Sequence, residues 1–328
     1  MSRVSENSSV HSINYAVGKT KSKVEDLQLK GSTLKRVSKP SDDPVGNLEI
    51  MSIRSQNVDA NQYLRNASFA QTHLSFTENI LEEMTDLLVK AKELAVGQAS
   101  NIYSPEIRQG VAKEIHQMRQ QLVSLANKRM GNRYIFAGQK VLTRPFDADG
   151  KFSGDNNKIQ IEINKDVFLP INLTGGEIFF SKEKRPVQRE DLNLETPEQL
   201  LDMNLVRAPA STSPEMVHVS VFDEMRSLEN ALLTNNPEII QGLLENLDTT
   251  IERVVAFRTE MGALTNTISN SENNIEKTRL INEAQKSKIE DADVAELMSN
   301  LQKEQNVLKA TYKASANLMN TSLMDFLR

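Results

Sequence analysis

A run of apolar residues at alternating steps of three and four constrains this chain more than any other feature of its sequence. The members of the run are Ala60, Tyr63, Ala67, Ala70, Leu74, Leu81, Met84, Leu88, Ala91 and Ala95. Only Thr77 interrupts it. A mean spacing near 3.5 residues is typical of the core positions of a coiled coil. The pattern therefore predicts a continuous helix from Pro44 to about Gln98, about 80 Å long at 1.5 Å per residue, and hence a long helical rod.

A second long helix is predicted in the C-terminal part of the chain, where Asn236-Pro237 forms a helix start. Its apolar residues keep the same steps and are Ile240, Leu243, Leu247, Ile251, Val254, Phe257, Met261, Leu264, Ile268 and Ile275. We expect this helix to pack lengthwise against the one that begins at Pro44. Two shorter helices are also predicted, one from Ser104 to Gly131 and one over residues 214–234.

Both ends of the chain carry weaker apolar patterns, which polar residues interrupt. The candidate assembly residues on these ends are Ile13, Val17, Val24, Leu27, Val294, Met298, Leu301, Leu308, Tyr312, Met319 and Phe326. Sparse apolar stripes leave isolated helices marginal in water. We therefore expect the termini to be disordered in the monomer and to gain their packing from one another or from other subunits.

The first helix should end near Val37, because Pro40 disfavours a helical backbone in the residue before it. Asp42 and Asp43 are interpreted as structural cap residues, with Pro44 as the first position of the next helix. The two carboxylates could also serve acid–base chemistry. Their place just before a helix start favours the capping interpretation, since the helix dipole stabilises acids there.

The composition excludes several functional classes. The absence of cysteine removes disulfides, thiolate nucleophiles and zinc–thiolate sites. A net charge of −5, with acids and bases mixed along the chain, argues against a nucleic-acid partner. Only 5% of the residues are aromatic, which is lean for a thick globular core but sufficient for helices that bury narrow stripes. No apolar run is long enough to cross a bilayer, and Met1–Lys19 lacks the apolar core of a secretory signal.

The pattern changes to a period of two within residues 134–213. Isoleucines alternate with polar residues over Ile159–Ile163, and apolar segments lie on either side of Gly175-Gly176, which is interpreted as a hairpin turn. We predict a small β-rich domain inserted between helical segments, with Pro209–Pro214 as the linker that leaves it. The fold class is therefore mainly α, with a long antiparallel helical rod and a β-rich insert.

No set of residues carries catalytic or cofactor-binding chemistry. The acidic loop Asp147–Asp155 departs from a calcium-binding EF-hand at Lys151, Phe152 and Lys158. Gly175-Gly176 matches no phosphate-binding loop. The four histidines are widely separated and are interpreted as surface or rim residues: His11, His73, His116 and His218. We predict no enzymatic activity, no cofactor and no metal.

Three segments resemble the flagellin superfamily. Lys35–Pro44, which reads Lys-Arg-Val-Ser-Lys-Pro-Ser-Asp-Asp-Pro, looks like the block that follows the first helix in that superfamily, and its ending is similar to that of the hook-filament junction group. Gly131–Gly138 resembles the place where the helical part gives way to the insert, and Ile289–Glu296 with Leu323–Leu327 resembles the C-terminal end. Together these cover roughly the first 140 and the last 90 residues.

One departure from the superfamily pattern concerns the end of the first helix. Where the superfamily usually has Gly before the Lys-Arg pair, this chain has Leu34, and Gly31 lies three residues earlier. We therefore expect the bend after the first helix to lie elsewhere.

The resemblance implies a structural axial protein of the bacterial flagellum, which is exported unfolded through the flagellar type III apparatus and polymerises at the hook-filament junction outside the cell. It implies self-association, contacts with a neighbouring hook-associated protein and with flagellin, and a cytosolic export chaperone on the C-terminal helix. We divide the chain accordingly into an N-terminal assembly helix and linker (1–43), two parts of a helical rod (44–133 and 214–288), an insert (134–213) and a C-terminal assembly helix (289–328). Flagellin itself and a cytosolic coiled-coil scaffold are the alternatives.

Overall fold

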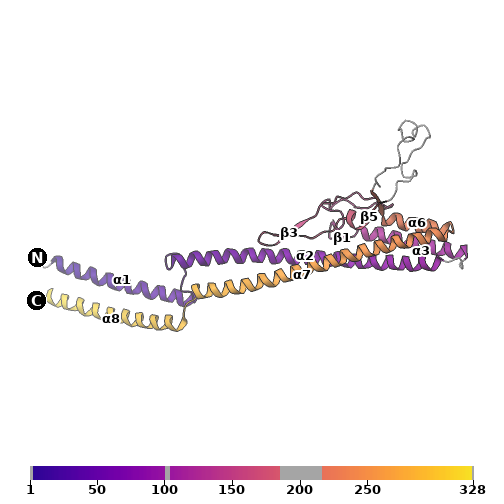
Figure 1. Cartoon of the computed structure of the whole chain (residues 1–328). Helices are drawn as coiled ribbons and strands as arrows, with labels where there is room; N and C mark the ends of the chain where they lie inside the picture. The colour runs from indigo at the N-terminus through magenta and orange to yellow at the C-terminus, as the bar shows by residue number, and fades with distance from the viewer. Residues whose placement is uncertain (1–2, 100–103, 185–215, 327–328) are drawn as a thin grey trace, which may run out of the picture. The chain divides into compact units, whose positions relative to one another are not determined.

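The computed structural model describes residues 3–99, 104–184 and 216–326, and most of these lie in helices (Figure 1). They form two compact units, residues 63–273 and residues 1–62 with 274–328. The principal helices are α1 (Arg3–Thr33), α2 (Pro44–Gln98), α3 (Pro105–Ala126), α6 (Val221–Leu233), α7 (Pro237–Glu290) and α8 (Val294–Phe326). The prediction of a mainly α chain with long helices and a β-rich insert is confirmed.

The unit formed by residues 63–273 is built on the heptad pattern that the sequence displays. In α7, residues at intervals of seven are fully or almost fully buried: Ile240, Leu247, Val254, Met261 and Ile268. Leu74, Leu81 and Leu88 of α2 are buried in the same core cluster. The two helices run in opposite directions, because Arg258 bonds to Glu78 while the later α2 residue Lys92 pairs with the earlier α7 residue Asp248.

Thr77, which interrupts the apolar run of α2, is fully buried. Its hydroxyl donates a hydrogen bond of 2.9 Å to the carbonyl oxygen of His73, one turn earlier. A buried hydroxyl that bonds to its own helix leaves no unsatisfied polar group. The polar residue is therefore compatible with the coiled-coil core.

The insert consists of short antiparallel strand pairs around a cluster of aromatic rings. In the described part of the chain the strands are β1 (Arg129–Met130), β2 (Arg133–Tyr134), β3 (Gln160–Asn164), β4 (Val167–Pro170), β5 (Phe180–Lys184) and β6 (Met216–Ser220), with the short helix α4 (Gly175–Ile178) between β4 and β5. The ring of Phe179 lies 4.7 Å from that of Phe146 and 5.2 Å from that of Phe222, centroid to centroid. Such contacts between buried rings stabilise the insert beyond the area that they bury.

The interpretation of Gly175-Gly176 as a hairpin turn is wrong. Both glycines lie in α4, and the β3–β4 hairpin turns at Asp166, which has a left-handed φ of 60°. Gly175 is required by close packing, since a Cβ atom there would lie 2.7 Å from the ring of Phe146. The glycine pair therefore marks a close approach of the backbone to the aromatic cluster.

Two predicted helix boundaries also need correction. The helix predicted for 214–234 begins as strand β6, which pairs with β5, and becomes helical only at Val221. The helix predicted to end at Gly131 ends at Ala126, and Gly131 forms the turn between β1 and β2 with a φ of 60°. In both cases pairing with another strand overrides the local pattern. The proposed linker Pro209–Pro214 lies outside the described residues.

The second unit contains α1, α8, the first part of α2 and the last part of α7. Helices α1 and α8 run side by side in opposite directions (Figure 1). The described parts of both terminal segments are thus helices packed on one another, which is the first of the two sources of packing expected for them. The expectation that they are disordered in the monomer stays a prediction. The low stability of these helices when isolated stays a prediction.

Candidate assembly region

Helix α1 ends at Thr33, not near Val37 as predicted. Leu34, the next residue, has a φ of 54°, a left-handed conformation that residues other than glycine rarely adopt. The expectation that the bend lies elsewhere is therefore wrong. The bend lies at the position where the superfamily usually has Gly, and a half-exposed leucine adopts the conformation that glycine adopts without strain.

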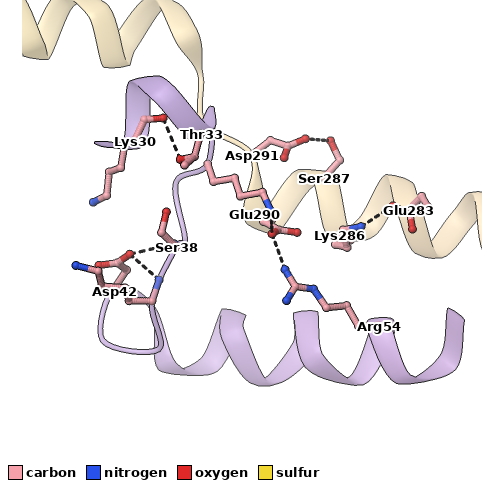
Figure 2. A network of polar contacts seen from close by, with 12 residues as sticks. Lys30, Thr33, Ser38, Asp42, Arg54, Glu283, Lys286, Ser287, Glu290 and Asp291 are labelled. Carbon is pink, nitrogen blue, oxygen red and sulfur yellow. Dashed lines mark hydrogen bonds and ion pairs between the residues drawn. The ribbon is translucent and has the colours of Figure 1, made fainter. Parts of the chain in front are cut away.

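The link between α1 and α2 is held by the two neighbouring aspartates, which have different partners. One carboxylate oxygen of Asp42 accepts hydrogen bonds from the backbone N–H groups of Ser38 and Lys39, at 3.0 and 3.1 Å (Figure 2). Asp43 accepts a hydrogen bond of 2.9 Å from the backbone N–H of Gly46, which is the geometry of a helix N-cap, and α2 begins at Pro44. Asp42 thus closes the turn before the helix, and Asp43 caps the helix.

These hydrogen bonds also shift the acidity of both groups. Backbone donors at Ser38 and Lys39 lower the pKa of Asp42 below its ordinary value. The backbone N–H of Gly46 and the side chain of Arg36 lower the pKa of Asp43. Both carboxylates are therefore held in the charged form that accepts these bonds.

Glu290, the last residue of α7, is the centre of a polar cluster that sequence analysis did not single out. Its side chain is only 2% exposed, and one carboxylate oxygen lies 2.6 Å from Lys35 Nζ and 2.7 Å from Arg54 Nη2 (Figure 2). Its backbone carbonyl accepts hydrogen bonds from the N–H groups of Arg36 and Val37. We call Glu290, Lys35, Arg54 and the backbone of residues 34–37 and 289–292 the Glu290 cluster.

The electrostatics of the Glu290 cluster favour the ionised carboxylate. Burial by itself would raise the pKa of Glu290, but the hydrogen bond from Lys35 and the positive charge of Arg54 outweigh it, so that the pKa lies below the ordinary value. Arg36 extends the network by donating from its guanidinium to the carbonyl of Ile289, at 2.8 Å, and to Asp43, at 3.3 Å. The cluster therefore joins the α1–α2 link and the start of α2 to the end of α7, which lies 236 or more positions away in the sequence.

The predicted assembly residues are divided between two environments. Val24 is buried, and Ile13, Val17, Leu27, Leu301 and Leu308 are half-buried. Leu297, which was not singled out, is buried and lies close to Gly31 of α1. In contrast, Val294, Met298 and Tyr312 are exposed. The side chains of Met319 and Phe326 lie outside the described residues.

The exposed members lie along one edge of the apolar stripe of α8. At 100° per residue, Val294, Met298 and Tyr312 fall within about 40° of one another around the helix axis. Leu308 and Leu297 lie about 40° and 60° from Val294, on the opposite side from Met298, and form the more buried part of the same stripe. The same unit also exposes apolar residues at the start of α2, where Val45 and Leu48 are more than two-thirds exposed. These side chains are about half or more exposed, although the methyl group of Met298 also lies close to Gly31 of α1.

Groups that could suggest chemistry have structural environments. The interpretation of His73 as a surface residue is wrong: it is buried on α2, burial lowers its pKa, and a hydrogen bond with the backbone of Ile171 opposes that shift. In the acidic loop, Asp147 accepts hydrogen bonds from the backbone N–H groups of Asp149 and Lys151. Within the described ranges no cluster of three metal-ligating side chains occurs, and no helix is long and apolar enough to cross a membrane. The side chain of His218 lies outside the described residues.

Comparisons with known proteins agree with this architecture. The bacterial flagellin N-terminal helical region matches residues 4–141, and the bacterial flagellin C-terminal helical region matches residues 244–327. Flagellar hook-associated protein 3 of Salmonella typhimurium is 27% identical over 95% of this chain and 96% of its own length. The protein of the same name from Escherichia coli is 28% identical over 89% of both chains. A crystal structure of flagellar hook associated protein-3 from Legionella pneumophila has a TM-score of 0.59, with 18% identity, 73% of this chain covered and 98% of that chain.

The chain belongs to the flagellin superfamily, since the two flagellin regions match its N-terminal and C-terminal helical parts in order. The predicted resemblance to the hook-filament junction group is confirmed by the hook-associated protein 3 relatives. These relatives also confirm the prediction of a structural protein rather than an enzyme.

Proposed function

We propose that this chain is an axial structural subunit that polymerises at the junction between the flagellar hook and filament. The observation that carries the proposal is the uncovered apolar surface of the unit containing both termini. The exposed face of α8 includes Val294, Met298 and Tyr312, and the start of α2 adds Val45 and Leu48. A solitary molecule leaves these side chains in water, whereas neighbouring copies would bury them.

The paired terminal helices suit this role because their own interface is thin. Val24 and Leu297 are the buried apolar side chains that the described parts of α1 and α8 contribute. Burial of so little apolar surface gives the pair limited stability of its own. We infer that contact with other subunits completes the ordering of both helices, so that folding of the ends and assembly are coupled.

Partners and route follow from the same proposal. A neighbouring hook-associated protein would contact one side of the assembled subunits and flagellin the other, and a cytosolic chaperone would hold the C-terminal helix before export through the type III apparatus. The exposed apolar side chains of α8 form the kind of surface that docks into the hydrophobic groove of a partner protein. In this division of labour residues 1–43 and 289–328 act in assembly, 44–133 and 214–288 form the rod, and 134–213 form the insert.

Removal of α8 tests the proposal. A chain that lacks residues 294–328 should keep the unit formed by residues 63–273 folded, as amide exchange in α3 and α6 would show, but should no longer be incorporated between hook and filament. The control is the full-length chain with the exposed Leu142 of the insert replaced by Ser, which should still be incorporated. Normal flagella with the truncated chain would refute the proposal.

Two alternatives predict different behaviour. Flagellin itself would form filaments of micrometre length when the purified chain is incubated, whereas a junction subunit would form only short assemblies without the adjoining proteins. A cytosolic scaffold would stay in the cell, so immunoblotting of sheared flagella and of culture supernatant separates it from both flagellar roles.

A further inference from the structure

The contact between α1 and α8 has few features that would fix the alignment of the two helices. Its buried apolar side chains in the described region are Val24, at 6% exposure, and Leu297, at 7%. The ion pair between Lys23 and Glu304, at 3.5 Å, is more than half exposed on the lysine side, and exposed pairs contribute little to stability. With so few buried side chains, apolar packing along the two helices specifies their alignment only weakly.

The Glu290 cluster, in contrast, specifies one alignment. Backbone hydrogen bonds join Arg36 and Val37 to the carbonyl of Glu290, and Ala292 to the carbonyl of Leu34. These bonds fix which residue at the end of α1 lies opposite which residue at the start of α8. The carboxylate of Glu290 adds Lys35 from the link and Arg54 from α2 to the same point.

We propose that Glu290 is the positioning residue that sets the register of α1 against α8 in the isolated subunit. The carboxylate pairs with two cations from separate segments while it is almost completely shielded from water. A shifted register would remove Lys35 and leave Arg54 as the remaining cation of the cluster, and loss of one partner of a buried ion pair is strongly unfavourable. The correct pairing is therefore selected by a polar contact at the base of the helices, not by apolar packing along them.

The effect of this register on assembly rests on the proposed function. The register determines which side chains of α8 are covered by α1 and which, such as Met298 and Tyr312, stay exposed to a neighbouring subunit. A chain with a slipped pair would cover part of that exposed surface and would join other copies poorly. The positioning role itself can nevertheless be measured in a single molecule.

The test replaces Glu290 with Gln in the full chain and measures the pairing of the terminal helices directly. Because the chain has no cysteine, K23C and E304C can be introduced and spin-labelled. The parent chain should give one narrow distance distribution by pulsed electron paramagnetic resonance, and E290Q should broaden it. Amide protection in α1 and α8 should fall about tenfold or more, since a hydrogen-bonded charge is lost, while α3 and α6 keep their protection.

A matched control lies two turns earlier on the same helix. Glu283 pairs with Lys286 at 2.7 Å and accepts a hydrogen bond from Asn57, but it is half exposed. E283Q should leave both the distance distribution and the protection unchanged. A milder second variant, Lys35→Met, removes one partner of Glu290. It should broaden the distance distribution less than E290Q does, and it serves as the test if E290Q also unfolds parts of the chain beyond α1 and α8.

The outcomes separate this inference from the proposed function. A narrow, parent-like distribution and normal protection in E290Q would overturn the positioning role, whatever the chain does in assembly. Equal broadening in E283Q and E290Q would overturn it too, because the effect would then follow any loss of charge on α7. If the parent chain fails to join flagella while E290Q still broadens the distribution, the proposed function fails and the positioning role stands.

Discussion

Because Leu34 has a left-handed backbone conformation, we expect glycine to be more stable than alanine at this position, whereas the reverse holds inside helix α1. At a φ of 54° the backbone of an L-residue is strained by about 1–2 kcal/mol. Glycine removes this strain, but its greater conformational freedom in the unfolded chain offsets part of the gain. We expect Leu34→Gly to be more stable than Leu34→Ala by about 1 kcal/mol. Comparison of these two variants cancels the loss of the leucine side chain, which is half exposed.

Gly18 provides the opposite case within α1. It lies in the helix interior, and a Cβ atom there would meet nothing within 4 Å. Gly18→Ala should therefore stabilise α1 by about 1 kcal/mol, through helix propensity alone. Amide exchange in α1 reports both changes, each of which corresponds to a factor of about five in protection. If alanine is equal to or better than glycine at position 34 while Gly18→Ala stabilises the helix, Leu34 is not the left-handed helix stop.

Three further predictions concern the unit formed by residues 63–273. Leu81→Ala should destabilise it by about 2–5 kcal/mol in urea unfolding, because the side chain is fully buried, whereas Val89→Ala at a more exposed site should cost far less. Gly150→Ala should prevent normal packing of the insert, seen as lost dispersion of aromatic NMR signals, because its φ is 87° and the new Cβ would overlap Phe222. Burial lowers the pKa of His73, so the folded chain favours the neutral imidazole. The contribution of His73 to folding stability is therefore present above its unfolded-state pKa near 6.5 and is lost as the pH falls through the folded-state pKa. His73→Gln should flatten this part of the stability profile, and an unchanged profile would refute the assignment.

The sequence predicts the structure best where that structure depends on residues close together along the chain. The heptad series of α2 and α7, the helix start at Pro44 and the alternation in β3 all follow from periodicity and local backbone preferences. The predictions that were wrong concern segments whose conformation depends on contacts with residues distant in the sequence. Gly175-Gly176 has the composition of a turn, yet packing against Phe146 places it in a short helix.

The sequence by itself determined that this chain forms long helices with an inserted β-rich segment, because an apolar period is a property of each segment alone. Only the tertiary structure decided which face of α8 meets α1, and that Val294 and Met298 stay exposed while Leu297 is buried. Only the tertiary structure, likewise, joined Lys35 to Glu290 across 255 positions. Burial and charge pairing depend on which remote segments meet in space, and a pattern read along one segment does not contain that information.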